Sequence, residues 1–89
     1  MQAIIDGAII ESRQQLHDTL SEQLCFPAHY GRNLDALFDC LTDITEDTEL
    51  HLLHQEELFA HLGVYADVLR GVLRDACGEN SHLSLILEE

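Results

Sequence analysis

Three short apolar runs, set far apart in the chain, constrain its fold more than any other feature. They are QAIID at residues 2–6, TELHLL at residues 48–53 and HLSLILE at residues 82–88, and each has the length and apolar content of a strand. Strands separated by connections of helical length are normally parallel, and their crossovers are right-handed. The pattern therefore predicts a small α/β fold, with a three-stranded parallel sheet packed by about four helices.

The size and the apolar content of the chain set further bounds. Of its 89 residues, 46% are hydrophobic, which is enough for one core and too few for two. The nearly continuous run LSLIL at residues 83–87 favours a sheet covered by helices over one with a face in water. We therefore expect a single domain over residues 1–89.

Local signals predict where the first helix and the last two helices begin and end. Ser12 stands three residues before Gln15, the spacing of a capping box, and the helix that follows should end before Pro27. A later helix over residues 55–62 should end at Gly63, because glycine readily adopts the left-handed conformation at a helix end. The helical period then resumes at residue 64 or 65 and continues to Cys77-Gly78.

The remaining helix carries a row of acids. Asn33 can accept hydrogen bonds from its first turn, and behind it four apolar residues at helical spacing define one buried face: Leu34, Leu37, Phe38 and Leu41. Asp35, Asp39 and Asp43 recur every four residues, so each is displaced by only about 40° around the helix from the one before. The three acids therefore form one continuous acidic ridge.

A row of charges on a helix is usually its solvated face, so the ridge needs a further argument. The positive end of the helix dipole favours Asp35 in the first turn. Asp43 lies near the other end, where a carboxylate is unfavourable, and it occupies the position where a basic partner of Asp39 would stand. Two of the acids thus have no local stabilising role, and a cationic partner docked on the ridge would offset their repulsion.

The net charge supports a basic partner. The chain has 17 acidic residues against 4 basic ones, all arginine, and a formal charge of -13. Such a field attracts basic proteins and repels nucleic acid and anionic membranes. No apolar run approaches the roughly 18 residues of a membrane span. We expect a basic protein as the partner, with no direct nucleic acid binding and no membrane association.

The cysteines and the amino terminus indicate a cytoplasmic protein. Cys25, Cys40 and Cys77 cannot all pair within one chain, and they lack the spacing of a disulfide framework. The start MQAIIDGAII has an acid at Asp6 and no basic region of an export signal.

Six histidines and three cysteines raise the possibility of a metal or catalytic site. The chain has no CxxC or HExxH motif, and His51 and His54 would point to opposite faces of a strand. A catalytic Cys-His pair is the less favoured alternative, because Cys40 lies beside core-facing residues as a buried structural thiol would. We expect no metal, no cofactor and no enzymatic activity.

The run FPAHYGRNLDALFDCLT at residues 26–42 resembles the signature region of the barstar family, small acidic intracellular inhibitors of secreted bacterial ribonucleases. LHDTLSEQL and the LSLIL ending are also similar to the family pattern, so the resemblance covers essentially the whole chain. It implies the same fold of three parallel strands and packed helices. It also implies that the second helix and the loop before it enter a ribonuclease active site, where Asp35 and Asp39 replace RNA phosphates and Asp39 is central.

The resemblance extends to the neighbouring residues. It implies that Asn33 and Thr42 are flanking hydrogen-bond partners and that Tyr30 and Gly31 shape the loop. Tyr30 stands beside a glycine, a position compatible with exposure or burial, and His29 occupies the place of an aromatic residue in the inhibitory members. The predicted partner-binding residues are His29, Tyr30, Gly31, Asn33, Asp35, Asp39, Thr42 and Asp43.

Two functions of different kinds follow. The first is a monomeric inhibitor that forms a 1:1 complex with a basic, secreted-type microbial ribonuclease and blocks its active site. The alternative is a barstar-like adaptor or regulatory module that binds a different basic protein. An enzyme is the third and least favoured hypothesis.

Overall fold

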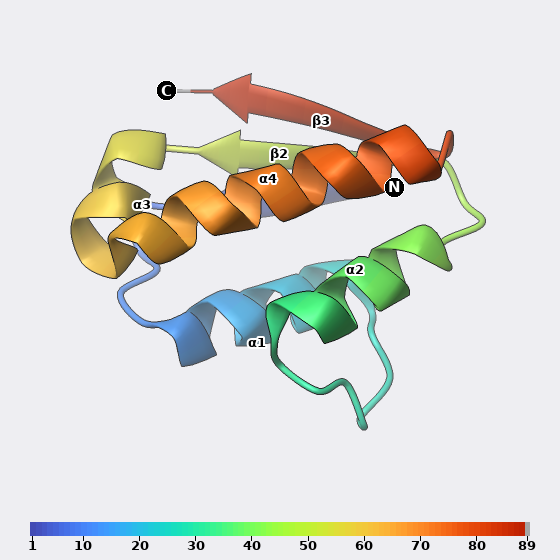
Figure 1. The fold of residues 1–89 in the computed structure, drawn as a ribbon, viewed down its shortest axis with the longest axis horizontal. Helices are drawn as coiled ribbons and strands as arrows, with labels where there is room; N and C mark the ends of the chain where they lie inside the picture. The colour runs from blue at the N-terminus through green and yellow to red at the C-terminus, as the bar shows by residue number, and fades with distance from the viewer. Residues whose placement is uncertain (89) are drawn as a thin grey trace.

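A computed structural model of the protein describes residues 1–88, and its elements follow the predicted order (Figure 1). The strands are β1 (Gln2–Asp6), β2 (Thr48–Leu53) and β3 (Leu83–Glu88). The helices are α1 (Arg13–Leu24), α2 (Leu34–Thr42), α3 (Gln55–Leu62) and α4 (Val64–Glu79). The predicted α/β fold with a three-stranded sheet and four helices is confirmed, and α4 extends two residues past Cys77.

The helix ends form as the local signals predict. The Ser12 hydroxyl accepts a hydrogen bond from the Gln15 backbone N–H at 3.1 Å and begins α1. α1 ends at Cys25, whose backbone is left-handed with φ of 55°. Gly63 has φ of 64° and separates α3 from α4 by a single residue.

The sheet has strand order β1-β2-β3, and both neighbouring pairs are parallel. In this register Ala3 pairs with Leu50, which pairs in turn with Leu85. With strands in sequential order, two right-handed crossovers place both helical connections on the same side of the sheet. Strand order therefore decides which face the helices cover.

One face of the sheet is buried and the other is not. Ile5 and Leu52 lie on the helix side and are almost fully buried. On the opposite side Ile4 is 39% exposed, as expected where both helical connections cross the other face. The expectation that helices would cover the sheet is therefore wrong for this face, because both connections lie on the other one.

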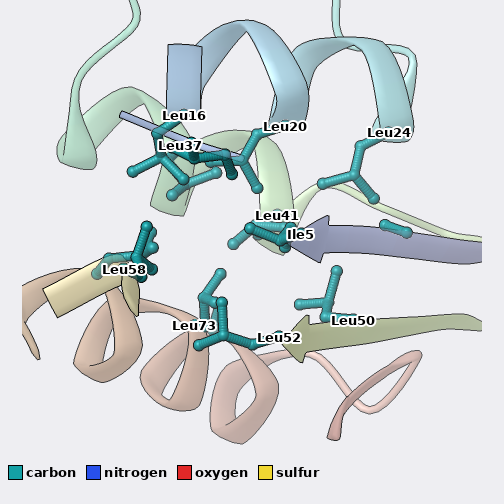
Figure 2. Close-up of a cluster of buried hydrophobic side chains, with 14 of the residues drawn as sticks. Ile5, Leu16, Leu20, Leu24, Leu37, Leu41, Leu50, Leu52, Leu58 and Leu73 are labelled. Atoms are coloured by element: carbon teal, nitrogen blue, oxygen red, sulfur yellow. The ribbon is translucent and has the colours of Figure 1, made fainter. Parts of the chain in front are cut away.

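The core lies between the buried face of the sheet and the helices (Figure 2). α2 packs against α4, and α1 and α4 pack against β1 and β3 respectively. Phe59 of α3 is 46% exposed, while its neighbour Leu58 is buried. The labelled side chains that meet in the core are Ile5, Leu16, Leu20, Leu24, Leu37, Leu41, Leu50, Leu52, Leu58 and Leu73.

No helix that the structure describes combines the length and the apolar character needed to cross a membrane.

Candidate protein-binding surface

The three acids of the predicted ridge are exposed along α2. Asp35 lies in the first turn, Asp39 lies one turn further on, and Asp43 is the C-cap residue. Across residues 1–88, none of these acids forms an ion pair with an arginine, a histidine or the amino terminus. The ridge therefore presents uncompensated negative charge to solvent.

The opposite side of α2 fixes the orientation of the ridge. Leu37 and Leu41 are fully buried, and Leu34 and Phe38 pack partly buried against the same core. Burying these apolar residues leaves only one way for the helix to face, as their spacing predicts.

The loop before α2 packs closely on the start of the helix. The Asn33 side-chain oxygen accepts from the Ala36 backbone N–H at 2.7 Å, and its amide donates to the Gly31 carbonyl at 3.2 Å. A Cβ on Gly31 would lie only 3.2 Å from both the Ala36 Cβ and the Asn33 amide nitrogen. Gly31 thus permits a close approach that a larger residue would disturb.

The two predicted flanking hydrogen-bond partners are already engaged within the protein. Asn33 supplies the cap of α2, and the Thr42 hydroxyl lies 3.0 Å from the Phe38 carbonyl oxygen and donates within the helix. Each side chain therefore stabilises α2 itself, whatever it contributes to a partner.

Tyr30, for which the sequence left exposure and burial open, is buried with 5% of its surface exposed. Its ring centroid lies 4.9 Å from that of Phe26, and its hydroxyl lies 2.6 Å from Nδ1 of His17 on α1. Tyr30 thus holds the loop against α1 and offers little surface to a partner.

The histidine that receives Tyr30 is itself buried. Nε2 of His17 lies 2.8 Å from the Tyr65 hydroxyl on α4, so the imidazole joins two tyrosines. Burial lowers the pKa of His17, the Arg32 charge lowers it further, and Asp18 opposes both. Burial is also the largest cause of the raised pKa of Tyr30 and of Tyr65, so all three groups are neutral near pH 7.

The family model described as Barstar (barnase inhibitor) matches residues 1–87.

This chain belongs to the barstar family.

A relative from Bacillus subtilis (strain 168), named Putative ribonuclease inhibitor YrdF, is 43% identical over 88 residues. The match covers 96% of each chain. The resemblance drawn from residues 26–42 is therefore confirmed for essentially the whole chain, and it points to an inhibitor and away from an enzyme.

In this barstar-family protein, Asn80 at the end of α4 forms hydrogen bonds with the backbone at the end of α2, where the ridge also ends. Asn80 is 7% exposed, and its side-chain amide donates to the carbonyls of Leu41 at 3.0 Å and Ile44 at 2.8 Å. The bond to Ile44 satisfies a carbonyl just beyond α2, and the bond to Leu41 adds to the one that this carbonyl accepts from the Ile44 backbone N–H at 3.3 Å. The sequence showed no sign of this contact, because Asn80 is distant from α2 along the chain.

Two surface depressions adjoin the ridge of the barstar fold. An open pocket of about 630 Å³ lies at its start and includes Asn33 and Asp35 in its walls. A second depression of about 270 Å³ lies near its end and includes His29, Cys40 and Asp43. The predicted site residues are therefore spread along α2 and the loop before it, and they do not converge on one cavity.

Two of the cysteines, Cys40 and Cys77, are partly buried in this barstar-family protein. Burial is the largest cause of the raised pKa of Cys40, and the nearby Asp43 and Asp39 raise it further. Burial also raises the pKa of Cys77. The thiols of Cys40 and Cys77 are therefore held in their protonated, weakly nucleophilic form. Within residues 1–88, no group of three or more histidine, cysteine or acidic side chains is placed to hold a metal ion.

Proposed function

We propose that this protein inhibits a basic ribonuclease of the secreted microbial type by docking its acidic ridge in the enzyme's active site. The observation that carries the proposal is the row of uncompensated carboxylates on α2 in a member of the barstar family. The name of the Bacillus subtilis relative supports the same class of target.

The spacing of the ridge suits the replacement of RNA phosphates. Along an α-helix four residues rise by about 6 Å, so Asp35, Asp39 and Asp43 repeat at intervals comparable with successive phosphates of a nucleic acid strand. Asp39 lies between the other two and would meet the centre of the cationic site. The cationic groups that bind phosphate in such an enzyme would then pair with carboxylates, and RNA would be excluded.

The field of the whole molecule adds to this contact. A net charge of -13 steers a basic enzyme toward the inhibitor over distances of about the Debye length, near 10 Å at 0.1 M salt. The surrounding residues would orient the ridge: His29, Tyr30, Gly31 and Asn33 from the loop, and Thr42 from the helix. We further propose that the protein acts in the cytoplasm as a monomer that forms a 1:1 complex.

Inhibition of barnase, the enzyme in the family's description, tests the proposal. Asp39→Asn removes the central charge and should raise the inhibition constant about 30-fold or more, as expected for a hot-spot residue. Glu57→Gln on α3 removes the same charge away from α2 and should change the constant by less than about twofold. Neither exposed substitution should alter the free energy of unfolding by more than about 0.5 kcal/mol.

Two outcomes would count against the proposal. Equal inhibition by the wild type and the Asp39→Asn protein would remove the ridge from the interface. Failure of the wild type to inhibit barnase at low salt would exclude that enzyme. Capture of basic proteins from a cell extract would then separate a different nuclease from the adaptor role, in which the partner is another basic protein.

A further inference from the structure

The pocket at the start of the ridge has an unusual charge for this protein. Its walls include Arg13 from α1 and Arg32 from the loop, along with Asp35 and Tyr65. These are two of only 4 basic residues in a chain with 17 acidic ones. Both arginines stand at the edge of the surface that is proposed to meet a basic enzyme, where a positive charge would weaken binding.

Within residues 1–88, Arg13 has no carboxylate partner. Its guanidinium carbon lies 4.2 Å from the centroid of the Tyr65 ring, and across residues 1–88 it forms no ion pair. The Tyr65 hydroxyl is bonded to His17 and its pKa is raised by burial, so the ring is a neutral platform. The contact holds the guanidinium in place through a cation–π interaction and leaves its charge uncompensated.

Arg32 is held by a different contact. Its guanidinium pairs with Asp18 of α1, with Nη2 2.9 Å from the carboxylate, and about half of each side chain is exposed. Its backbone is left-handed, with φ of 50°, in a residue that is not glycine. The pocket therefore contains two guanidinium groups, each held by a neighbouring side chain, and the Asp18 carboxylate that pairs with Arg32 lies outside its walls. Asp35 shares the wall, but it is not paired with either arginine.

We propose that the ribonuclease docked on the ridge places an acidic side chain, aspartate or glutamate, in this pocket against Arg13 and Arg32. The inference rests on the proposed function and deepens it. Guanidinium groups bind carboxylates through paired N–H···O bonds. A partner with a basic centre opposite Asp39 and an acid opposite Arg13 would dock in one orientation, and basic enzymes without that acid would bind less tightly.

Removal of one positive charge from the pocket tests the proposal, because a partner with an acid there and a uniformly basic partner predict opposite changes in the inhibition constant. Against a uniformly basic partner, removal of any positive charge from the inhibitor should leave binding unchanged or strengthen it. Arg13→Gln should instead raise the inhibition constant of the ribonuclease that the wild type inhibits, barnase first, by about tenfold or more. Arg70→Gln is the matched control, because Arg70 pairs with Asp67 beside a different depression. It should change the constant by less than about twofold.

A conservative variant and a mutant cycle locate the effect. Arg13→Lys keeps the charge and should restore most of the inhibition lost in Arg13→Gln. In the enzyme, each acid of the binding face is replaced in turn by its amide, and the inhibition constant is measured with the wild-type and the Arg13→Gln inhibitor. For one of these acids, the effects of the two substitutions on the inhibition constant should not add. An Arg13→Gln protein that inhibits as well as Arg70→Gln, or better, would overturn the pocket assignment. The Asp39→Asn variant would still test the role of the ridge separately.

A titration without any enzyme completes the test. N-acetylglutamate blocked as its α-amide carries a single side-chain carboxylate and should shift the NMR signals of the Arg13 and Arg32 Nε–H groups, whereas the N-acetylglutamine α-amide, which is neutral, should not. Absence of any shift would overturn the inference even if no ribonuclease were inhibited. Tighter binding of inorganic phosphate than of the carboxylate would also overturn it, because the pocket would then be a site for a free anion.

Discussion

The Tyr30 hydroxyl lies 2.6 Å from Nδ1 of His17, and both side chains are buried. This contact joins the loop before α2 to the middle of α1, and it sets the loop that leads into the acidic ridge. Tyr30 therefore supports the start of the acidic ridge from within the protein.

Tyr30→Phe should destabilise the protein by about 1–3 kcal/mol, because it leaves a buried ring nitrogen of His17 without its partner. Urea unfolding at pH 7.5 measures the change. Tyr65→Phe is the matched control: the Tyr65 hydroxyl also bonds His17, but it is only partly buried, so water can replace it at lower cost. An equal loss of unfolding free energy in the two variants would show that burial of the Tyr30 hydroxyl does not add to its contribution to stability.

Stability should fall as the pH decreases below about 6.5. The pKa of His17 is lowered below its ordinary value of 6.5 by burial and then by Arg32, with Asp18 opposing. Below that value the unfolded chain binds more protons at this residue than the folded protein, so the free energy of unfolding falls as the pH drops toward the lowered pKa, and above 6.5 it is fully retained.

Replacement of the histidine isolates this contribution. His17→Gln, which can still bond both tyrosines, should lose less stability between pH 7.5 and 5.5 than the wild type in urea unfolding. His29→Gln, at an exposed site, should follow the wild type. A wild-type pH dependence in His17→Gln would exclude His17 as its source.

Asn80→Ala should destabilise the protein by about 1–3 kcal/mol, because the buried amide is lost, the Ile44 carbonyl loses its donor, and the Leu41 carbonyl keeps only the longer bond from the Ile44 backbone N–H. Asn80→Asp should not rescue it, since a carboxylate cannot donate to a carbonyl. Thermal unfolding of the two variants tests this, and a fully stable Asp variant would contradict the proposed contact.

Two glycines should respond in opposite directions to alanine. A Cβ on Gly7 would lie 2.4 Å from the His54 carbonyl oxygen, so Gly7→Ala should destabilise the fold by about 3 kcal/mol. Gly71 lies within α4, and a Cβ there would meet nothing within 4 Å. Gly71→Ala should therefore stabilise the protein by about 1 kcal/mol. Chemical unfolding measures both, and a destabilised Gly71→Ala protein would contradict the open space beside that residue.

Association with a basic ribonuclease should slow steeply as salt is added, while dissociation changes little, because steering acts at long range. Stopped-flow kinetics between about 0.01 and 0.15 M ionic strength measure both rates. Asp39→Asn should act mainly on dissociation, since its contact forms only in the docked complex. A salt effect confined to dissociation would contradict steering by the net charge.

Features that depend on neighbours along the chain could be predicted from the sequence. The Asn33 cap, the end of α3 at Gly63 and the exposure of Asp35 and Asp39 all follow from residues within a few positions of one another. Helix caps and helix faces are local, so their signals lie in short stretches of sequence. The signature run and the family match extended that prediction to the whole fold.

Features that join separate elements could not be predicted in this way. His17 meets Tyr30 and Tyr65 only because α1, the loop and α4 converge. The uncovered face of the sheet likewise follows from strand order, which periodicity does not encode.

The sequence by itself determined the elements, the direction in which α2 faces and the acidity of its exposed side, because these depend on helical spacing and on composition. Only the tertiary structure decided that Tyr30 is buried, that Asn80 secures the end of α2, and that Arg13 and Arg32 share a pocket with Asp35. Such contacts join residues far apart in the chain, so they exist only after the core has packed.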